Sequence, residues 1–285
     1  MYHYQGEFEV KAMCEFWGVS RAAYYEWTKK LGEVDPDQER MDAVQSVYEA
    51  SHRIYGYRRI TIQLQRKQGV WINHKTVLRL MCKLGIRSRA RKPKMYKNLE
   101  ENGTYHRYPN VLNRDFAATQ PNQKWVTDVT YIHTQQGWAY LSTIKDLYDP
   151  ERAQGVGFIV AHVFDHSNSI ALVTRTLRQA KQKEKITEGL ILHSDQGTQY
   201  TSQAYHLLIN EYHMTPSMSR HGNCWDNAPM ENFFSHLKEE YLRHFKKPTF
   251  QEAQQLIAEY IYFYNYERIQ LKTRQTPFET RCLSI

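Results

Sequence analysis

The sequence predicts a mixed α/β domain preceded by a small all-α region. After residue 122 the order of patterns is three strands, a helix, a strand, a helix, a short strand and a helix. This order predicts a mixed five-stranded sheet whose first three strands form an antiparallel meander. Before residue 100 the clear apolar periodicities are helical. A chain of 285 residues can hold one large domain and one or two small ones.

The distribution of charge points to a polyanionic partner at the N-terminal half. Residues 1–120 hold 21 Lys and Arg against 13 Asp and Glu, so they carry the entire net charge of +8, while residues 121–285 hold 17 of each sign. Residues 51–99 contain fourteen basic residues and no acidic one. A solvated helix face usually mixes both signs, so this window favours nucleic-acid binding.

Cysteine spacing and hydropathy exclude other classes of protein. The four cysteines are far apart in the sequence and form no C-x-x-C pair, which favours reduced thiols over a zinc ribbon or a redox pair. The thirteen histidines are scattered, so we propose no histidine metal site. No apolar run reaches membrane-spanning length, and the first residues lack the regions of a signal peptide. These features predict a cytosolic protein.

Residues 1–32 are predicted to form a helix-turn-helix-like hairpin. The segment 9–30 has two short helical patterns around the turn Gly18-Val19-Ser20, and Ser20 is a plausible N-cap for the second. Two helices joined by a tight turn are the outline of a DNA-binding helix-turn-helix. A plain packing hairpin remains an equally good interpretation.

Residues 40–98 are predicted to form a basic helical DNA-binding domain followed by an arm. Asn73 is the expected N-cap of helix 74–84, and Gly85 stands where a left-handed residue ends a helix. Its basic side chains recur at i, i+4 and i+8, a row that can follow phosphates or enter a major groove; the alternative is a solvated helix face. The candidate DNA contacts here are Arg58, Arg59, Lys75, Arg79, Lys83, Arg87, Arg89, Arg91, Lys92 and Lys94.

The arm, residues 86–98, has no apolar periodicity, and Pro93 discourages a continuous helix. Such a basic tether fits the DNA backbone or a minor groove, and it is equally compatible with a disordered linker. Residues 99–121 are polar and aromatic with two prolines, and we assign them to the linker between domains.

Residues 122–285 are predicted to form a second domain, of mixed α/β structure, with a C-terminal helix. Strands are expected at 125–132, 138–144 and 155–164, with a turn at 135–137 and a polar hairpin tip at 145–154. A helix capped near residues 167–169 leads to a strand that ends at Asp195, and Thr201-Ser202 cap the next helix. The run Thr249-Phe250-Gln251-Glu252 is a capping box that opens the last long helix.

Three carboxylates lie on three elements that could converge. Asp128 is in the middle of a strand, Asp195 stands at the C-terminal end of another, and Glu231 opens an amphipathic helix. A site of carboxylate oxygens suits a hard divalent cation such as Mg²⁺. We leave Asp226 out of this set. Three further carboxylates are interpreted as turn residues: Asp146, Asp149 and Asp165.

The loops beside these carboxylates contain further candidate DNA contacts. Gln196, Gln199 and Tyr200 offer amides and a stacking ring, with ordinary turn capping as an equal alternative. Arg220 and Asn223 suit contact with a phosphate. Asn227 is better interpreted as the N-cap of the Glu231 helix.

Six motifs of the sequence occur together in one known family. They are YGYRRI (55–60), INHKTVLRLMCKLGI (72–86), WVTDVTYI (125–132), HSDQGTQYTS (193–202), SRHGNCWDNAPMENFFSHLKEE (219–240) and YNYERIQLKTRQTPFE (264–279). With these motifs the chain resembles bacterial insertion-sequence transposases of the OrfB type, which have a DDE catalytic domain like that of retroviral integrases. The resemblance covers the chain from about residue 45 to its end, and it departs from the family in a longer segment 145–166.

The resemblance implies an RNase H-like fold and Mg²⁺-dependent cutting and transfer of DNA strands. It matches Asp128, Asp195 and Glu231 to the three catalytic carboxylates of the family. The substrate that it implies is the terminal inverted repeats of the element. The expected cofactor is two Mg²⁺ ions, for which Mn²⁺ can substitute. The expected partners are double-stranded DNA of the element ends and target, a second copy of the chain to pair two ends, and a first-frame fusion partner; the expected location is the bacterial cytoplasm, at the nucleoid.

Two other functions are compatible with parts of the sequence. A DNA-binding regulator without catalysis explains the basic N-terminal half but leaves the three carboxylates unexplained. A nuclease of the same fold would use the same residues to cut without joining, and the sequence does not separate these two reactions.

Overall fold

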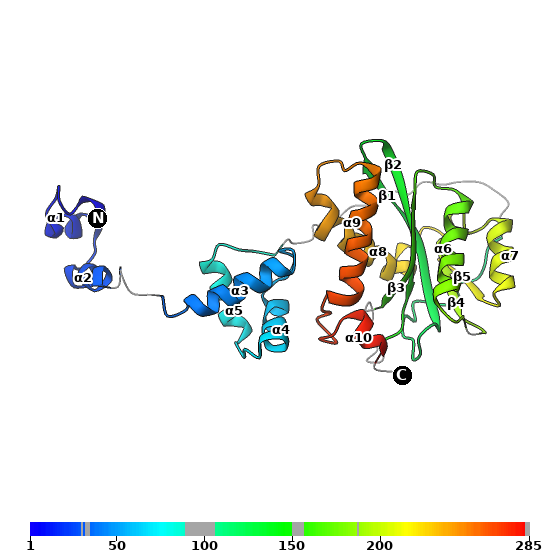
Figure 1. Ribbon diagram of the computed structural model, residues 1–285, viewed down its shortest axis with the longest axis horizontal. Coiled ribbons are helices and arrows are strands. Elements are labelled where there is room, and N and C mark those ends of the chain that lie inside the picture. Colours follow the sequence, from blue (N-terminus) through cyan, green and yellow to red (C-terminus); the bar gives the residue numbers. More distant parts are fainter. Residues whose placement is uncertain (30, 32–34, 89–105, 150–156, 187, 283–285) are drawn as a thin grey trace.

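The computed structural model describes residues 1–29, 31, 35–88, 106–149, 157–186 and 188–282, and all structural statements concern these (Figure 1). The chain begins with a hairpin of two helices, α1 (Val10–Trp17) and α2 (Arg21–Lys29). Gly18 ends α1 with φ of +63°, a left-handed conformation that glycine adopts without steric cost. The Ser20 hydroxyl accepts a hydrogen bond from the Ala23 amide at 3.1 Å, which confirms the predicted cap.

Three helices form the next unit: α3 (Gln38–Ala50), α4 (Tyr57–Gln68) and α5 (His74–Lys83). The Asn73 side chain accepts from the Lys75 amide, and Gly85 has φ of +69°, so both predicted ends of α5 are confirmed. Five side chains without any exposed surface hold the unit together: Val44, Ile60, Leu64, Val77 and Leu80.

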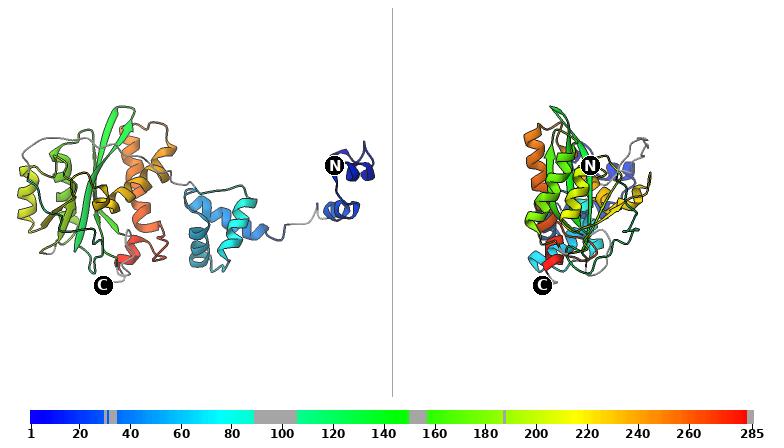
Figure 2. Two further views of the ribbon diagram at one scale, coloured as in Figure 1. Left: turned by 180° about the vertical axis from the view of Figure 1, so that it is seen from behind. Right: turned by 90° about the vertical axis from the view of Figure 1, so that its right-hand side faces the viewer.

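The sheet has five strands in the order β3-β2-β1-β4-β5. It forms one layer with helices on its two sides (Figures 1 and 2). The first three pair antiparallel, as predicted, and β4 and β5 pair parallel to β1. The third strand begins at residue 158, three residues later than predicted. The strands are β1 (Lys124–Thr134), β2 (Gly137–Asp146), β3 (Phe158–Asp165), β4 (Ile191–Ser194) and β5 (Thr215–Met218).

The pairing between β1 and β4 is short, and this positions the candidate site. In the described sheet, β4 covers β1 only from Lys124 to Val126. Asp128 therefore lies beyond the covered stretch, while β4 ends at Ser194, one residue before Asp195. Ends of parallel strands at an uncovered sheet edge are common positions for ligand sites in α/β proteins.

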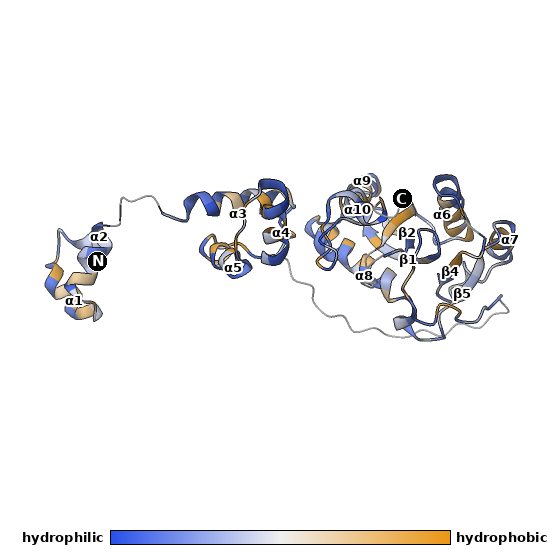
Figure 3. Ribbon diagram, turned by 90° about the horizontal axis from the view of Figure 1, so that it is seen from below, coloured by the Kyte–Doolittle hydropathy of each residue, from blue (hydrophilic) through white to orange (hydrophobic). Residues whose placement is uncertain are grey.

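Helices cover both faces of the sheet (Figures 1 and 3). On one face lie α6 (Ile170–Lys183) and α7 (Gln203–Glu211). On the other lie α8 (Ala228–His236), α9 (Phe250–Tyr262) and α10 (Pro277–Cys282). Two clusters of buried apolar side chains follow from this, one on each face. No helix in the described part of the chain has the length and apolarity needed to cross a lipid bilayer.

The helix that carries Glu231 does not end at His236. It continues as a π-helical segment, Leu237–Tyr241, and then as a short 3-10 turn. The predicted capping box is confirmed: the Thr249 hydroxyl accepts from the Glu252 amide, and the Glu252 carboxylate accepts from the Thr249 amide. The last long helix ends at Tyr262, where a second π-helical segment, Phe263–Glu267, follows.

The predicted linker is wrong for residues 106–121, because they pack on the sheet. Leu112 is fully buried and its amide donates to the Ser217 hydroxyl at 3.0 Å. The His106 amide donates to the Thr201 carbonyl at 3.1 Å, and Ala118 forms a bridge to Tyr148. Residues 99–105 lie outside the described part. A sequence with prolines and polar residues can still pack when its few apolar side chains find a groove.

The three-helix unit is docked on the C-terminal segment. The Tyr55 hydroxyl donates to the Glu267 carbonyl at 3.1 Å and accepts from the Ile269 amide at 2.9 Å. Arg59 Nε donates to the Ile269 carbonyl at 3.1 Å. The apolar core is also continuous from α3–α5 into the α8 and α9 face of the sheet. The prediction that Arg59 contacts DNA is therefore corrected. Its guanidinium instead joins the three-helix unit to the C-terminal segment.

Candidate active site

Asp128, Asp195 and Glu231 come from three elements that meet at the uncovered edge of β1. Asp128 lies in β1, Asp195 follows β4, and Glu231 lies in the first turn of α8. Each side chain keeps some access to solvent. The charges of Asp195 and Glu231 both act on the Asp128 carboxylate. The three predicted carboxylates therefore share one electrostatic environment.

This environment raises the pKa of two of the aspartates. Loss of hydration raises the pKa of Asp128 well above its usual value, and the charges of Asp195 and Glu231 raise it further. The protein atoms around the Asp195 carboxyl also displace water and raise its pKa, although its side chain remains exposed. Like charges at short range are unfavourable without a cation, and such arrangements are typical of functional sites.

Backbone amides orient both aspartates. Asp128 Oδ1 accepts from the Val129 amide at 2.7 Å, and Asp195 Oδ1 accepts from the Gly197 amide at 3.0 Å. Gly197 suits this turn because a Cβ there would lie 3.0 Å from Asp195 Oδ1, closer than ordinary packing allows. Both bonds favour the ionised carboxylate and oppose the rise in pKa.

The donor set fits Mg²⁺ in its chemistry, because three carboxylates supply only oxygen ligands. The arrangement is not a preformed cage: within the described ranges, no group of three or more His, Cys, Asp or Glu side chains is arranged to hold a metal ion. Metal binding would therefore have to draw the three carboxylates together, which is common where ligands repel each other in the absence of the ion.

Lys238 is a site residue that the sequence analysis missed. Its ammonium lies 2.5 Å from Thr130 Oγ1 and 4.7 Å from the centre of the Tyr131 ring. Its positive charge lowers the pKa of Asp128 and so opposes the acidic cluster. The signal was available, because Lys238 follows Glu231 by two helical turns and residues at i and i+7 share a face.

Asn227 occupies the predicted N-cap position of α8, but its side chain does not cap the helix. Asn227 Nδ2 donates instead to the Thr127 carbonyl at 3.1 Å, while Oδ1 is buried without a hydrogen-bond partner among the described residues. The side chain thus ties the start of α8 to β1, one residue before Asp128. That bond helps to set the distance between Glu231 and Asp128.

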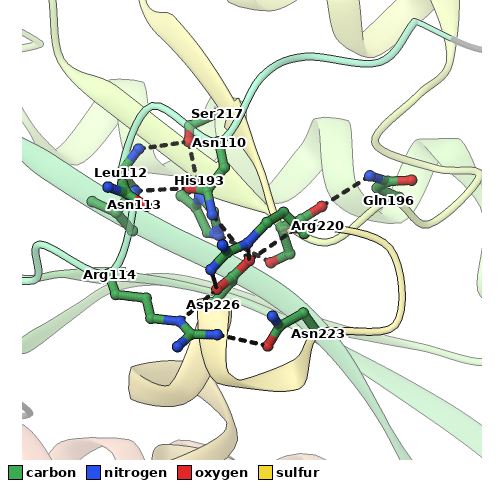
Figure 4. Close-up of polar contacts among 11 residues, drawn as sticks. Asn110, Leu112, Asn113, Arg114, His193, Gln196, Ser217, Arg220, Asn223 and Asp226 are labelled. Atoms are coloured by element: carbon green, nitrogen blue, oxygen red, sulfur yellow. Dashed lines mark hydrogen bonds and ion pairs between the residues drawn. The ribbon is translucent and has the colours of Figure 1, made fainter.

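Asp226 organises the loop before α8 (Figure 4). Its carboxylate has no exposed surface, and it accepts hydrogen bonds from Arg220 and from Arg114. The Arg114 guanidinium also donates to Asn223 Oδ1 at 2.9 Å. Arg220 and Asn223, predicted to contact phosphate, are therefore first of all parts of this network, although half of the Arg220 side chain is exposed.

The predicted stacking of Tyr200 on a DNA base is corrected, because its ring is not accessible. It is buried, packs edge-to-face on Tyr205, and its hydroxyl lies 3.2 Å from Thr127 Oγ1. Gln199 Nε2 donates to the Asn168 carbonyl, and Gln196 Nε2 donates to the Ser219 carbonyl. These amides tie the loop around Asp195 to two distant segments and do not cap their own turn, and contact of Gln199 with DNA stays a prediction.

The turn interpretation is wrong for Asp146 and Asp165, which are the last residues of β2 and β3, and these carboxylates and His193 have structural roles. Asp146 and Asp149 are buried, and Asp165 pairs with Arg175 at the end of β3. His193 is buried between the hydroxyls of Ser217 at 2.8 Å and Ser219 at 3.0 Å. Burial lowers the pKa of His193 to about 4, so its imidazole is neutral near pH 7.

The predicted basic row on α5 is partly neutralised. Arg79 pairs with Asp37 at 2.7 Å and Lys83 pairs with Asp35, and both aspartates come from the segment before α3. Lys75 on α5, together with Arg58 and Arg87, is exposed. Four residues of the predicted arm lie outside the described part: Arg89, Arg91, Lys92 and Lys94.

Comparison with known proteins identifies the family. Residues 118–224 and 231–284 match models described as integrase core domain, and residues 35–94 match an HTH-like domain. The chain is 39% identical over 267 residues to the putative transposase InsK of insertion sequence IS150 from Escherichia coli, covering 92% of this chain and 90% of that protein. It is 33% identical over 247 residues to transposase InsF of IS3A from the same organism, covering 83% and 81%. The chain belongs to the IS3 family of transposases.

The fold of this IS3-family transposase is thus an integrase core with a mixed five-stranded sheet, preceded by a helical HTH-like domain, as predicted. An uncharacterized 31 kDa protein of insertion element IS600 from Shigella sonnei is 36% identical over 259 residues, covering 90% of this chain and 92% of that protein. Among solved structures, an intasome of simian T-cell lymphotropic virus aligns with a TM-score of 0.49 at 13% identity, covering 84% of this chain and 74% of that one.

Proposed function

We propose that this transposase binds the terminal inverted repeats of its element, cleaves DNA strands there, and joins the freed 3′-hydroxyl to target DNA. One observation carries the chemistry: the charges of Asp195 and Glu231 both act on Asp128 at the uncovered edge of β1. Membership of a transposase family supports DNA as the substrate. The separate HTH-like domain supports a binding step distinct from catalysis.

Asp128, Asp195 and Glu231 would together hold the two Mg²⁺ ions, because their carboxylates supply the oxygen ligands that this cation prefers. When bound, such ions stabilise the charge on the entering and leaving oxygens of a phosphoryl transfer. Asn227 and the amides of Val129 and Gly197 keep the carboxylates oriented. The ammonium of Lys238 offers a positive charge for a DNA phosphate beside Asp128.

The reaction would run as two displacements in one site. Water attacks a phosphodiester at the element end, and the bond to the 3′-oxygen breaks to leave a 3′-hydroxyl. That hydroxyl then attacks a phosphate of the target and displaces its 3′-oxygen. No covalent intermediate with the protein is needed. Two element ends must be brought together, so we propose that at least a dimer assembles on DNA. Each copy would bind an end through the exposed basic side chains of α3–α5.

Incubation with Mg²⁺ and a labelled terminal-repeat duplex tests this proposal. Asp128→Asn, Asp195→Asn and Glu231→Gln should each abolish cleavage while leaving binding to the repeat within a few-fold of the wild-type value. Asp165→Asn is the matched control, because it removes a carboxylate from the same sheet at a distance from the site, and it should cleave normally.

The products separate the proposal from its alternatives. Joined strands support a transposase, whereas nicks without joining would indicate a nuclease. Binding without any cleavage by the wild-type protein would indicate a DNA-binding regulator. Full activity of Asp195→Asn would rule out the proposed site.

A further inference from the structure

A hollow of about 320 Å³ lies between the β1–β2 hairpin and the segment that follows α8. The mechanism above uses only one of its lining residues. One wall is aromatic and comes from the hairpin: Tyr131, His133 and Trp138. The other wall is basic and comes from residues after α8: Lys238, Arg243 and Lys247. The volume is within the range of small-molecule sites.

Two large rings of the aromatic wall are exposed to solvent over more than half of their surface. Tyr131 is 60% exposed and Trp138 is 55% exposed. The two rings meet edge-to-face with centroids 5.3 Å apart, and the His133 ring lies 4.6 Å from Trp138. Large exposed aromatic rings gathered at one place mark a binding surface, and a planar ligand can stack on them.

The hollow is built on a fixed frame. His133 and Trp138 are opposite each other in the β1–β2 ladder. The hairpin turn is tied to the segment before α9, since the Gln135 amide donates to the Pro248 carbonyl at 3.0 Å and the Phe250 amide donates to Gln136 Oε1 at 2.8 Å. These bonds hold the two walls at a set separation, so little order has to be gained when a ligand binds.

The charge of the hollow selects an anion. Among the described residues that line it, three are cationic and one, Glu239, is acidic, and Glu239 is paired with Arg243. Aromatic rings beside cations are the combination that binds single-stranded nucleic acid, through base stacking and phosphate contact. A base inside a duplex is already stacked and paired, so only an unpaired nucleotide can offer its face to Trp138.

The hollow is connected to the Asp128 region through Tyr131 and Lys238. Tyr131 follows Asp128 by three residues of extended strand, or about 10 Å, so the two side chains leave β1 on opposite faces, next to the edge that β4 leaves uncovered. Lys238 joins the two faces at this edge, because its ammonium bonds Thr130 Oγ1, on the same face of β1 as Asp128, and also lies over the Tyr131 ring. We propose that this hollow receives an unpaired nucleotide of the DNA strand whose neighbouring phosphate lies at the carboxylates. The proposal rests on the proposed function and specifies its substrate as a DNA end with unpaired nucleotides.

Binding without divalent metal tests the proposal apart from catalysis. The full-length protein is titrated, in EDTA, with a fluorescent terminal-repeat duplex that ends either blunt or in a short single-stranded extension. Trp138→Ala should weaken binding of the extended duplex about tenfold, the loss expected for one base–aromatic stack, and leave the blunt duplex unchanged. Trp138→Phe should retain most of the preference. Tyr262→Ala removes a 59% exposed ring from α9 and should change neither affinity.

Equal affinity of Trp138→Ala and wild-type protein for the extended duplex would overturn the proposal. An equal loss on both duplexes would also overturn it, because the ring would then contribute to DNA binding in general. The unchanged blunt-duplex affinity shows that the variant is folded. Since no strand is cut in EDTA, a wild-type protein that prefers the extended duplex but never cleaves in Mg²⁺ would reject the proposed function and keep the hollow as a nucleotide site.

Discussion

At the scale of single residues, Asp226 shows how a buried charge can be structural although it stands in the loop next to the candidate site. Its carboxylate receives the guanidinium groups of Arg114 and Arg220, the amide of Arg220, and Asn110 Nδ2. The hydrogen bonds of Arg220 hold the pKa of Asp226 far below its usual range, against the opposing effect of burial. The loop that leads to Glu231 is thus closed by one ionised side chain.

We predict that Asp226→Asn lowers the free energy of unfolding by about 2 kcal/mol, because hydrogen bonds to a buried charge are lost and two arginines lose their counter-ion. Because the folded pKa is depressed, the contribution of Asp226 is present above the ordinary aspartate pKa and is lost as the pH falls below it. Urea titrations at pH 7 and at progressively lower pH measure both effects. Asp165→Asn, which breaks a surface pair, should cost less than about 1 kcal/mol; equal losses in the two variants would contradict this account.

At the scale of elements, the helix that carries Glu231 is anchored at its far end. Glu240, in the π-helical segment after α8, forms a two-bonded pair with Arg268, at 2.8 and 2.5 Å. Tyr260 donates to the same carboxylate at 2.8 Å, and His236 lies 3.1 Å from it. Both partners of the pair are buried. Glu231, Lys238 and Glu240 thus belong to one continuous helical element fixed at both ends.

We predict that Glu240→Gln costs about 3–5 kcal/mol of unfolding free energy, because it leaves the Arg268 charge buried without a counter-ion. Burial alone would raise the pKa of Glu240, but Arg268 and His236 hold it well below its usual value. The stabilisation is therefore complete above the ordinary glutamate pKa and is lost as the pH falls below it. Denaturant melts at pH 7 and in acid measure the difference, which should shrink in acid.

Two variants control this experiment. Glu239→Gln changes the neighbouring residue, which pairs with the exposed Arg243, and should cost no more than about 1 kcal/mol. Glu240→Gln combined with Arg268→Met removes the uncompensated charge and should recover part of the stability. A double variant that is less stable than Glu240→Gln alone would show that the pair acts in another way.

At the scale of the whole molecule, the HTH-like domain is docked on the catalytic domain, and the contact uses basic residues of the acid-free window 51–99. Arg59 donates to the Ile269 carbonyl, and Arg66 donates to the Arg274 carbonyl at 2.7 Å and to the Glu279 carboxylate at 2.7 Å. Tyr55 makes two more bonds to the same segment. The C-terminal segment that receives these bonds also contains Arg268, the partner of Glu240.

We predict that Tyr55→Phe uncouples the two domains in calorimetry. The wild-type protein should unfold α3–α5 and the catalytic domain in one transition, whereas Tyr55→Phe should separate them or lower the shared melting temperature, because two buried backbone groups lose their partner at about 1–3 kcal/mol each. Tyr57→Phe makes the same change on a ring that contacts Arg58 and His74 within the three-helix unit, and should leave the transition unchanged. Identical thermograms for the two variants would show that this contact does not couple the domains.

The sequence by itself determined the type and order of the main elements, several helix ends and the identity of the acidic residues. Apolar periodicity, the caps at Ser20, Asn73 and Ser202, and the capping box at Thr249 are local signals, because burial and the first and last hydrogen bonds of a helix depend on near neighbours. The antiparallel pairing of the first three strands and the three carboxylates followed from the same patterns and from the family resemblance.

Only the tertiary structure decided which side chains meet. It brought Arg114 to Asp226, Tyr55 to Ile269 and Lys238 to Asp128, and it buried Tyr200, whose polar neighbours in the sequence had indicated an exposed loop. It also packed residues 106–121 onto the sheet, where composition had indicated a linker. Such contacts join residues that can lie more than a hundred positions apart, and they depend on the packing of whole elements, which no short stretch of the chain contains.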